Sequence, residues 1–161
     1  MITAVIVTYN RKELLSQNIE MLLKQTITFD SIIIVDNCSD DGTYEYLKKC
    51  GWTKAPFIYL RTETNIGGAG GFYTGVKAAY EAGADWIVLM DDDGRMADER
   101  TMEILYCTAK KLYDENRGDH KLFVNALVQK ENLLSFKIDH MYTVDEAVLA
   151  AKNGLIEGAA N

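Results

Sequence analysis

The sequence predicts an α/β fold in which a mostly parallel sheet is covered by helices on both faces. Short apolar segments alternate along the chain with segments of helical periodicity. The apolar segments lack regular polar alternation, which is typical of parallel strands buried on both faces. Polar clusters follow four of these segments, and ligands of such sheets bind beyond the carboxyl ends of the strands. We therefore expect a binding site on one rim of the sheet.

Runs of apolar residues predict the strands. The run Trp86-Ile-Val-Leu-Met90 indicates a short, fully buried strand, and the run at 133–138 is weaker than the others. In chain order, the expected strands cover residues 2–8, 31–36, 57–60, 86–90, 122–128 and 133–138.

Apolar residues at helical spacing predict the helices. Leu15, Ile19 and Leu22 share one face of the first helix. A glycine-rich loop over residues 67–71 precedes the third helix, which we expect to begin at Phe72. In chain order, the expected helices cover residues 13–25, a segment ending near 49 with Ser39 or Asp40 as its cap, 72–82, a segment capped by Asp98 that includes Met102 to Leu112, and 144–152.

The composition indicates one globular domain with an acidic surface. The chain has 161 residues, of which 48% are hydrophobic, and a net charge of −7, which argues against a nucleic-acid partner. Cys38, Cys50 and Cys107 show no metal-ligand spacing, so we expect free thiols in a reducing compartment. No apolar run approaches the roughly 20 residues of a membrane span. We expect a cytoplasmic protein, which a longer chain could place at the inner face of the membrane.

Three adjacent carboxylates, Asp91 to Asp93, follow the strand at 86–90. Their mutual repulsion would be relieved by a hard divalent cation, and phosphates could complete its oxygen ligands. We therefore predict Mg²⁺ or Mn²⁺ held against a nucleotide diphosphate. One alternative is a solvated turn. Another is a haloacid-dehalogenase phosphatase with Asp91 as nucleophile and Asp93 as acid/base, although Arg95 stands where that motif usually has Thr or Val.

Other polar clusters extend the predicted site. The glycines of residues 67–71 could offer amides to phosphate, or could form a flexible turn. Tyr73 excludes a dinucleotide fingerprint and Val76 excludes a P-loop. Asp36 could accept hydrogen bonds from a base or ribose, or cap its own turn. Arg11 could meet a diphosphate, or be a solvated residue at a helix start.

Taken together, these motifs resemble the inverting glycosyltransferases of family 2, which have the GT-A fold. The resemblance covers about residues 2–115. A glycine-rich segment at 65–72 and the triple aspartate resemble the galactofuranosyltransferase and rhamnosyltransferase-like branch. The motifs that carry the family resemblance are Val5-Ile-Val-Thr-Tyr-Asn-Arg11, Ile34-Val-Asp-Asn-Cys-Ser-Asp-Asp-Gly-Thr43 and the Asp-x-Asp at 91 and 93.

The resemblance implies a site for a nucleotide-diphosphate sugar, with a UDP-sugar favoured and a dTDP-sugar as the alternative. It implies a Mn²⁺ or Mg²⁺ ion that holds the diphosphate. The implied roles are Thr8, Tyr9, Arg11 and Asp36 around the nucleotide, Asn65, Gly67 and Gly68 beside the nucleotide and sugar, Asp92 near the ribose, and Asp91 and Asp93 at the metal.

The resemblance also implies that a saccharide or lipid-linked acceptor attacks the sugar with inversion, after deprotonation by a carboxylate base. That base normally lies downstream of the Asp-x-Asp, so we expect it beyond residue 161. Residues 1–161 are then expected to form a single nucleotide-sugar-binding GT-A domain that lacks the acceptor-binding part and self-associates through exposed apolar surface. The alternative is a non-catalytic nucleotide-binding module that needs a partner or a missing domain.

Overall fold

The computed structural model describes residues 1–115, 129–130 and 133–134. The chain divides into two units, residues 1–102 and 103–161. The second contains most of α4 (Thr101–Glu115) and a short antiparallel pair, β5 (Gln129–Lys130) with β6 (Leu133–Leu134). The strand expected at 122–128 and the helix expected at 144–152 lie outside the described residues.

The first unit contains a parallel sheet in the strand order β3-β2-β1-β4. All three neighbouring pairs are parallel, which confirms the predicted architecture. Every residue of the two central strands except Ser31 is buried, because helices cover both faces of the sheet. The strands are β1 (Ile2–Thr8), β2 (Ser31–Asp36), β3 (Phe57–Arg61) and β4 (Trp86–Asp91).

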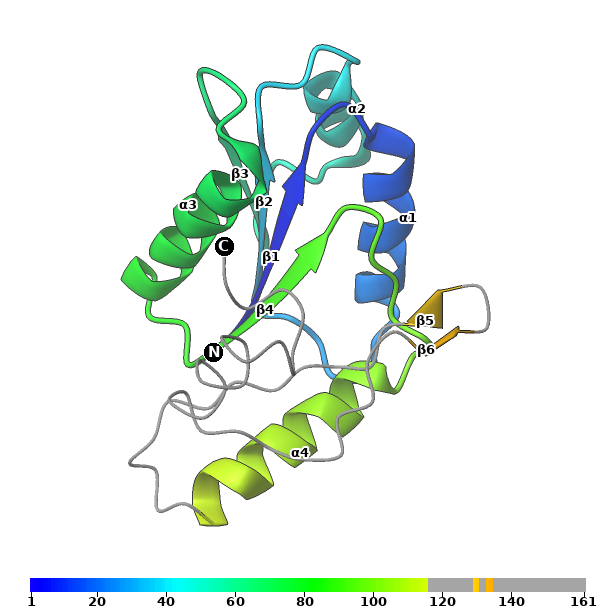
Figure 1. The fold of residues 1–161 in the computed structure, drawn as a ribbon, viewed down its shortest axis with the longest axis vertical. Coiled ribbons are helices and arrows are strands. Elements are labelled where there is room, and N and C mark those ends of the chain that lie inside the picture. Colours follow the sequence, from blue (N-terminus) through cyan, green and yellow to red (C-terminus); the bar gives the residue numbers. More distant parts are fainter. Residues whose placement is uncertain (116–128, 131–132, 135–161) are drawn as a thin grey trace. The chain divides into compact units, whose positions relative to one another are not determined.

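Three helices connect the strands of this unit. Helix α3 (Gly67–Glu81) lies on one face of the sheet, and α1 (Lys12–Leu23) and α2 (Thr43–Cys50) lie on the other (Figure 1). Leu15 and Ile19 of α1 are fully buried, as their helical spacing predicts. Because these connections join parallel strands, the carboxyl ends of all four strands lie on one rim of the sheet, where ligands of such folds bind.

Helix α3 packs closely on the sheet through two glycines. A Cβ atom at Gly71 would lie 2.5 Å from Cγ1 of Val7, and one at Gly75 would lie 2.3 Å from Cγ1 of Val5. Both distances are below any normal carbon–carbon contact, so only glycine permits this approach. The spacing of four residues places both glycines on the same helical face.

The start of α3 corrects the sequence prediction. The predicted glycine-rich loop over 67–71 is the first turn of the helix, which begins at Gly67 rather than at Phe72. Low helix propensity predicted a loop, but contact with the sheet favours the helical conformation here. Gly67 has a φ of +73°, and its amide donates to Oδ1 of Asn65 at 2.8 Å.

Two further predictions are wrong in detail. Strand β4 was expected to be fully buried, but Leu89 is 43% exposed because β4 is an edge strand of the described sheet. Helix α2 begins after Gly42, and neither Ser39 nor Asp40 caps it. The Ser39 hydroxyl instead accepts a hydrogen bond from the Asn10 amide at 2.9 Å.

Two further features of the described residues are the state of the cysteines and the length of the apolar helices. The three cysteines are free thiols, as predicted; Cys38 is half-buried, and Cys50 and Cys107 are exposed. None of the helices in the described part of the chain is long and apolar enough to cross a membrane.

Replacing Gly75 with alanine should destabilise the fold. The added methyl group would overlap Val5, and overpacking of this kind costs about 1–3 kcal/mol. Urea unfolding should therefore show a lower midpoint for Gly75→Ala. The double variant Gly75→Ala/Val5→Ala should lose less stability than the two single variants added together, because removal of Cγ1 from residue 5 creates room for the methyl group. Additive losses in the double variant would contradict this packing.

Candidate functional site

The carboxyl ends of the four strands lie level on one rim of the sheet. The strand register pairs Thr8 with Asp36, Asp36 with Arg61, and Val7 with Asp91. Polar residues that are far apart in the sequence therefore meet at this rim. The predicted convergence of the clusters that follow β1, β2 and β4 is thus explained by the parallel register alone.

Asp92 is the buried member of the acidic loop that follows β4. Its side chain is 6% exposed. One carboxylate oxygen accepts a hydrogen bond from the Thr8 hydroxyl at 2.9 Å, and the other lies 3.3 Å from Nη1 of Arg11. Asp92 and Thr8, both predicted to lie at the nucleotide, are thus brought into direct contact and joined to Arg11.

Asp91 and Asp93 flank this buried carboxylate and are both exposed. Burial of part of the Asp91 side chain raises the pKa of its carboxyl group, and the negative charges of Asp93 and Asp92 raise it further. No described residue donates a hydrogen bond to the Asp91 carboxylate. The charge of Arg11 offsets only part of this effect, so a cation at Asp91 would further stabilise its ionised form.

The residues present fit a cation that shares its ligands with a phosphate group. Within the described part of the chain, no cluster of three or more Asp, Glu, His or Cys side chains could hold a metal by itself. Magnesium-type sites, however, commonly use one or two carboxylates together with substrate phosphates. Asp91 and Asp93 supply two hard oxygen donors of that kind.

Arg11 lies beside the acidic loop with half of its side chain exposed. Its Nη1 atom is 3.4 Å from Oδ2 of Asp93 as well as 3.3 Å from Asp92. The neighbouring Tyr9 is 45% exposed. The guanidinium thus provides positive charge at the rim, where its exposed fraction of 54% leaves it accessible to an anionic ligand.

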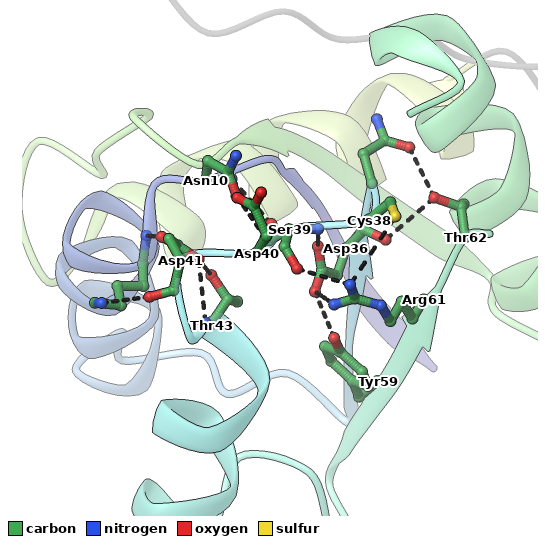
Figure 2. A network of polar contacts seen from close by, with 12 residues as sticks. Asn10, Asp36, Cys38, Ser39, Asp40, Asp41, Thr43, Tyr59, Arg61 and Thr62 are labelled. Carbon is green, nitrogen blue, oxygen red and sulfur yellow. Dashed lines mark hydrogen bonds and ion pairs between the residues drawn. The ribbon is translucent and has the colours of Figure 1, made fainter. Parts of the chain in front are cut away.

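Asp36 is the centre of a polar network at the ends of β2 and β3 (Figure 2). Its side chain is fully buried. One oxygen accepts from the Ser39 amide at 2.8 Å. The other accepts from the Tyr59 hydroxyl and from Nη1 of Arg61, the latter at 3.0 Å. Asp36 therefore caps its own turn, which was one of the two interpretations of the sequence, and also orients two side chains of β3.

This network leaves Arg61, rather than Asp36, at the surface. The Arg61 side chain is 42% exposed, and its Nη2 atom donates to the Ser39 carbonyl at 2.7 Å. A hollow of about 400 Å³ lies beside Arg61. The residues that line it are Ser39, Asp40, Gly42, Tyr44, Glu45 and Arg61.

The start of α3 is tied to the same rim. The Asn37 side chain, which follows β2, donates to the Gly67 carbonyl at 2.9 Å. A Cβ atom at Gly68 would have no described neighbour within 4 Å, in contrast to Gly71 and Gly75. Packing therefore explains the other two glycines, whereas nothing in the described part of the protein requires glycine at position 68.

Sequence reasoning missed Tyr59 and Arg61. The predicted strand ended at residue 60, one residue before Arg61, so this arginine was not counted among the residues at a strand end. An arginine directly after an apolar run was the available signal. Tyr59 gave none, because its hydroxyl meets Asp36 only through pairing of β2 with β3.

Tyr59→Phe should destabilise the protein by about 1.5–3 kcal/mol, the usual cost of losing a hydrogen bond to a buried charge. Chemical unfolding would measure this, with the half-exposed Tyr44→Phe as the matched control expected within about 0.5 kcal/mol of wild type. Burial and the bond to Asp36 also raise the pKa of Tyr59, so its ultraviolet ionisation should occur well above that of an ordinary tyrosine. Equal losses for both variants would contradict this role.

Comparison with known proteins identifies the family of this chain. The profile of glycosyl transferase family 2 matches residues 3–114. Galactofuranosyltransferase GlfT1 of Mycolicibacterium smegmatis is 40% identical over 108 residues, which are 67% of this chain and 35% of that protein. The chain thus spans about a third of the length of that curated relative.

Two solved structures share the fold. S. aureus TarS in complex with UDP has a TM-score of 0.56 at 22% identity, over 72% of this chain and 32% of TarS. The mannosyltransferase PcManGT from Pyrobaculum calidifontis, in complex with GDP-Man and Mn²⁺, has a TM-score of 0.53 at 22% identity, over 61% and 29%. These likenesses confirm the predicted GT-A fold. Together with the profile match and the similarity to the galactofuranosyltransferase, they show that this chain belongs to glycosyl transferase family 2.

Proposed function

We propose that this chain is the donor-binding part of a glycosyltransferase that uses a nucleotide-diphosphate sugar and a divalent cation. The observation that carries the proposal is the arrangement of the acidic loop. The buried Asp92 anchors the loop to Thr8 and Arg11, and the exposed Asp91 and Asp93 remain without full neutralisation. A diphosphate with a bound cation is complementary to such a site.

Asp91 and Asp93 would hold Mn²⁺ or Mg²⁺ together with the diphosphate. Such a cation would contribute Lewis-acid neutralisation of the charge on the departing nucleoside diphosphate. Arg11 would add a charge-assisted contact to the same phosphates, because its guanidinium already lies within 3.4 Å of Asp93. The fold neighbour PcManGT, in a structure with GDP-Man and Mn²⁺, supports a divalent cation.

The nucleoside would lie along the rim between Tyr9 and the Asp36 network. In the described arrangement the Asp36 carboxylate is fully engaged by protein donors, so Asp36 would act on the base through Arg61 or after Arg61 moves. Asn65, Gly67 and Gly68 at the start of α3 would border the nucleotide and sugar, where the amides of a helix terminus favour anions. Asp92, whose buried carboxylate accepts from the Thr8 hydroxyl, would lie near the ribose.

We favour a UDP-sugar, with a dTDP-sugar as the alternative. The TarS structure with UDP supports a uridine nucleotide, although the PcManGT structure with GDP-Man shows that the fold also accepts guanosine nucleotides. The acceptor would be a saccharide or a lipid-linked acceptor, and the transfer would invert the anomeric configuration. Because the chain spans about a third of its curated relative, we assign to residues 1–161 donor binding alone, with the general base and acceptor site contributed from outside them.

Two alternatives to the proposed function predict different experimental results. A non-catalytic nucleotide-binding module would bind UDP and Mn²⁺ without slow hydrolysis of a UDP-sugar, whereas a donor half of an enzyme would show some hydrolysis. The phosphatase alternative requires a covalent aspartyl intermediate at Asp91. Family membership favours glycosyl transfer over that alternative.

Calorimetric titration with UDP tests the proposed function. We expect UDP to bind at least about tenfold more tightly with Mn²⁺ than without it, and we expect Asp93→Ala to remove that enhancement. Glu81→Gln is the matched control, because this exposed carboxylate lies at the opposite end of α3 and should leave UDP binding unchanged. Absence of Mn²⁺-dependent binding of both UDP and dTDP would overturn the proposal.

Gly68→Ala should separate folding from binding. The added methyl group meets no described neighbour within 4 Å and improves helix propensity by about 0.5–1 kcal/mol, so stability should be equal or higher. UDP affinity in the presence of Mn²⁺ should nevertheless fall at least about fivefold, because the methyl group would occupy space reserved for the ligand. Wild-type affinity in Gly68→Ala would show that the start of α3 does not border the nucleotide.

A further inference from the structure

Helix α1 contacts the backbone of the acidic loop through a buried amide. Asn18 is fully buried, and its Nδ2 atom donates to the Asp91 carbonyl at 2.8 Å. The Gly94 amide donates to the same carbonyl at 3.0 Å and closes a tight turn around the two intervening aspartates. The carbonyl of Asp91 is therefore held from two sides, once by the loop and once by α1.

A second contact from α1 holds the same loop at its surface. Nη1 of Arg95 donates to the carbonyls of Asp92 at 3.1 Å and Gly94 at 2.6 Å. Nη2 of Arg95 donates to Oε1 of Gln17 at 3.0 Å. Gln17 and Asn18 are neighbours on α1, so the helix reaches three carbonyls of the loop, one directly and two through Arg95.

These contacts complement those of the Asp92 side chain with Thr8 and Arg11. Every one of them engages the loop backbone or its central carboxylate. Asp91 receives no hydrogen bond on its carboxylate from the described residues, and Asp93 has a half-exposed contact with Arg11 at 3.4 Å. The loop is thus fixed in position while its two flanking carboxylates stay accessible.

Packing alone does not explain an asparagine at position 18. Its Oδ1 atom is buried and has no hydrogen-bond partner. An unsatisfied buried acceptor destabilises a protein, whereas an apolar side chain of similar size would not. Of the other buried positions of α1, Leu15, Ile19 and Leu22 are aliphatic, and Ser16 is polar but has its hydroxyl paired with the Tyr46 hydroxyl at 2.9 Å. The Nδ2 contact to Asp91 is the feature that an aliphatic residue could not provide.

We propose that Asn18 is a positioning residue for the cation and diphosphate site, with the Arg95–Gln17 pair as a second, surface support. This inference rests on the proposed function, because it assigns to Asp91 and Asp93 the ligands named there. By holding the Asp91 carbonyl, Asn18 fixes the direction in which the two flanking carboxylates leave the loop. Residues that orient metal ligands in this way typically change metal affinity about 10–100-fold when replaced.

Asn18→Leu tests this role because binding and stability should respond differently. Leucine keeps the branched four-atom side chain of asparagine and removes the unsatisfied acceptor, but its methyl groups occupy more volume, so we expect the urea midpoint to fall by no more than in the control variant. The dissociation constant for Mn²⁺, measured by electron paramagnetic resonance in the presence of UDP, should increase about tenfold. The matched control is Ile19→Val, at the next buried position of α1, which should lower the midpoint and leave Mn²⁺ affinity unchanged.

Hydrogen exchange adds a readout that needs no metal. The Gly94 amide, which donates to the Asp91 carbonyl, should exchange several-fold faster in Asn18→Leu than in Ile19→Val. Asn18→Ala, which removes the donor and adds neither bulk nor charge, should weaken Mn²⁺ binding in the same direction if the leucine variant fails to fold.

Three outcomes would overturn the inference. Wild-type Mn²⁺ affinity in both Asn18 variants would overturn it and leave the proposed function intact. Equal loss of affinity in Ile19→Val would show that general destabilisation of α1 is the cause. Absence of Mn²⁺ binding by the wild-type chain, with or without UDP, would overturn the proposed function and this inference together.

Discussion

The parallel register of β1 with β2 and β4 concentrates negative charge on one rim of the sheet, and the rest of the site depends on how that charge is balanced. Asp36 is buried and neutralised by Arg61 and the Tyr59 hydroxyl. Asp92 is buried and paired with Thr8 and Arg11. In the loop that follows β4, Asp91 and Asp93 are the two carboxylates that the fold leaves exposed. The protein itself thus separates structural acids from acids available to a ligand.

The start of α3 depends on close packing of its backbone against the sheet, which requires residues without side chains. Gly71 and Gly75 are needed because α3 packs directly on Val7 and Val5. Asn37 then ties the first turn of the helix to the end of β2. Dense packing on the sheet therefore fixes where the helix terminus lies, and the open position at Gly68 is left on the same turn. A helix terminus and an acidic loop on the same rim of the sheet together suit an anion accompanied by a cation.

Helix α1 contacts both the hydrophobic core and the acidic loop. Its aliphatic residues fill the core, while Asn18 carries one polar contact from that core to the Asp91 carbonyl. The loop before α1 is bonded to the loop before α2 through Asn10 and Ser39, so the Arg11 and Asp36 regions support one another. Membership of glycosyl transferase family 2 provides the biochemical setting for this arrangement, and the chain covers about a third of its galactofuranosyltransferase relative.

The sequence by itself determined the parallel sheet, the rim that carries the candidate site and the acidic loop, because apolar runs and their polar ends are local patterns. It also indicated the family, through motifs that need no structure. Tertiary structure decided the rest. Whether Gly67 to Gly71 form a loop or a helix depends on contact with Val5 and Val7. Which aspartates are buried, and that Tyr59 and Asn18 support the rim, depends on strand pairing and helix docking, which bring together residues 23 and 73 positions apart.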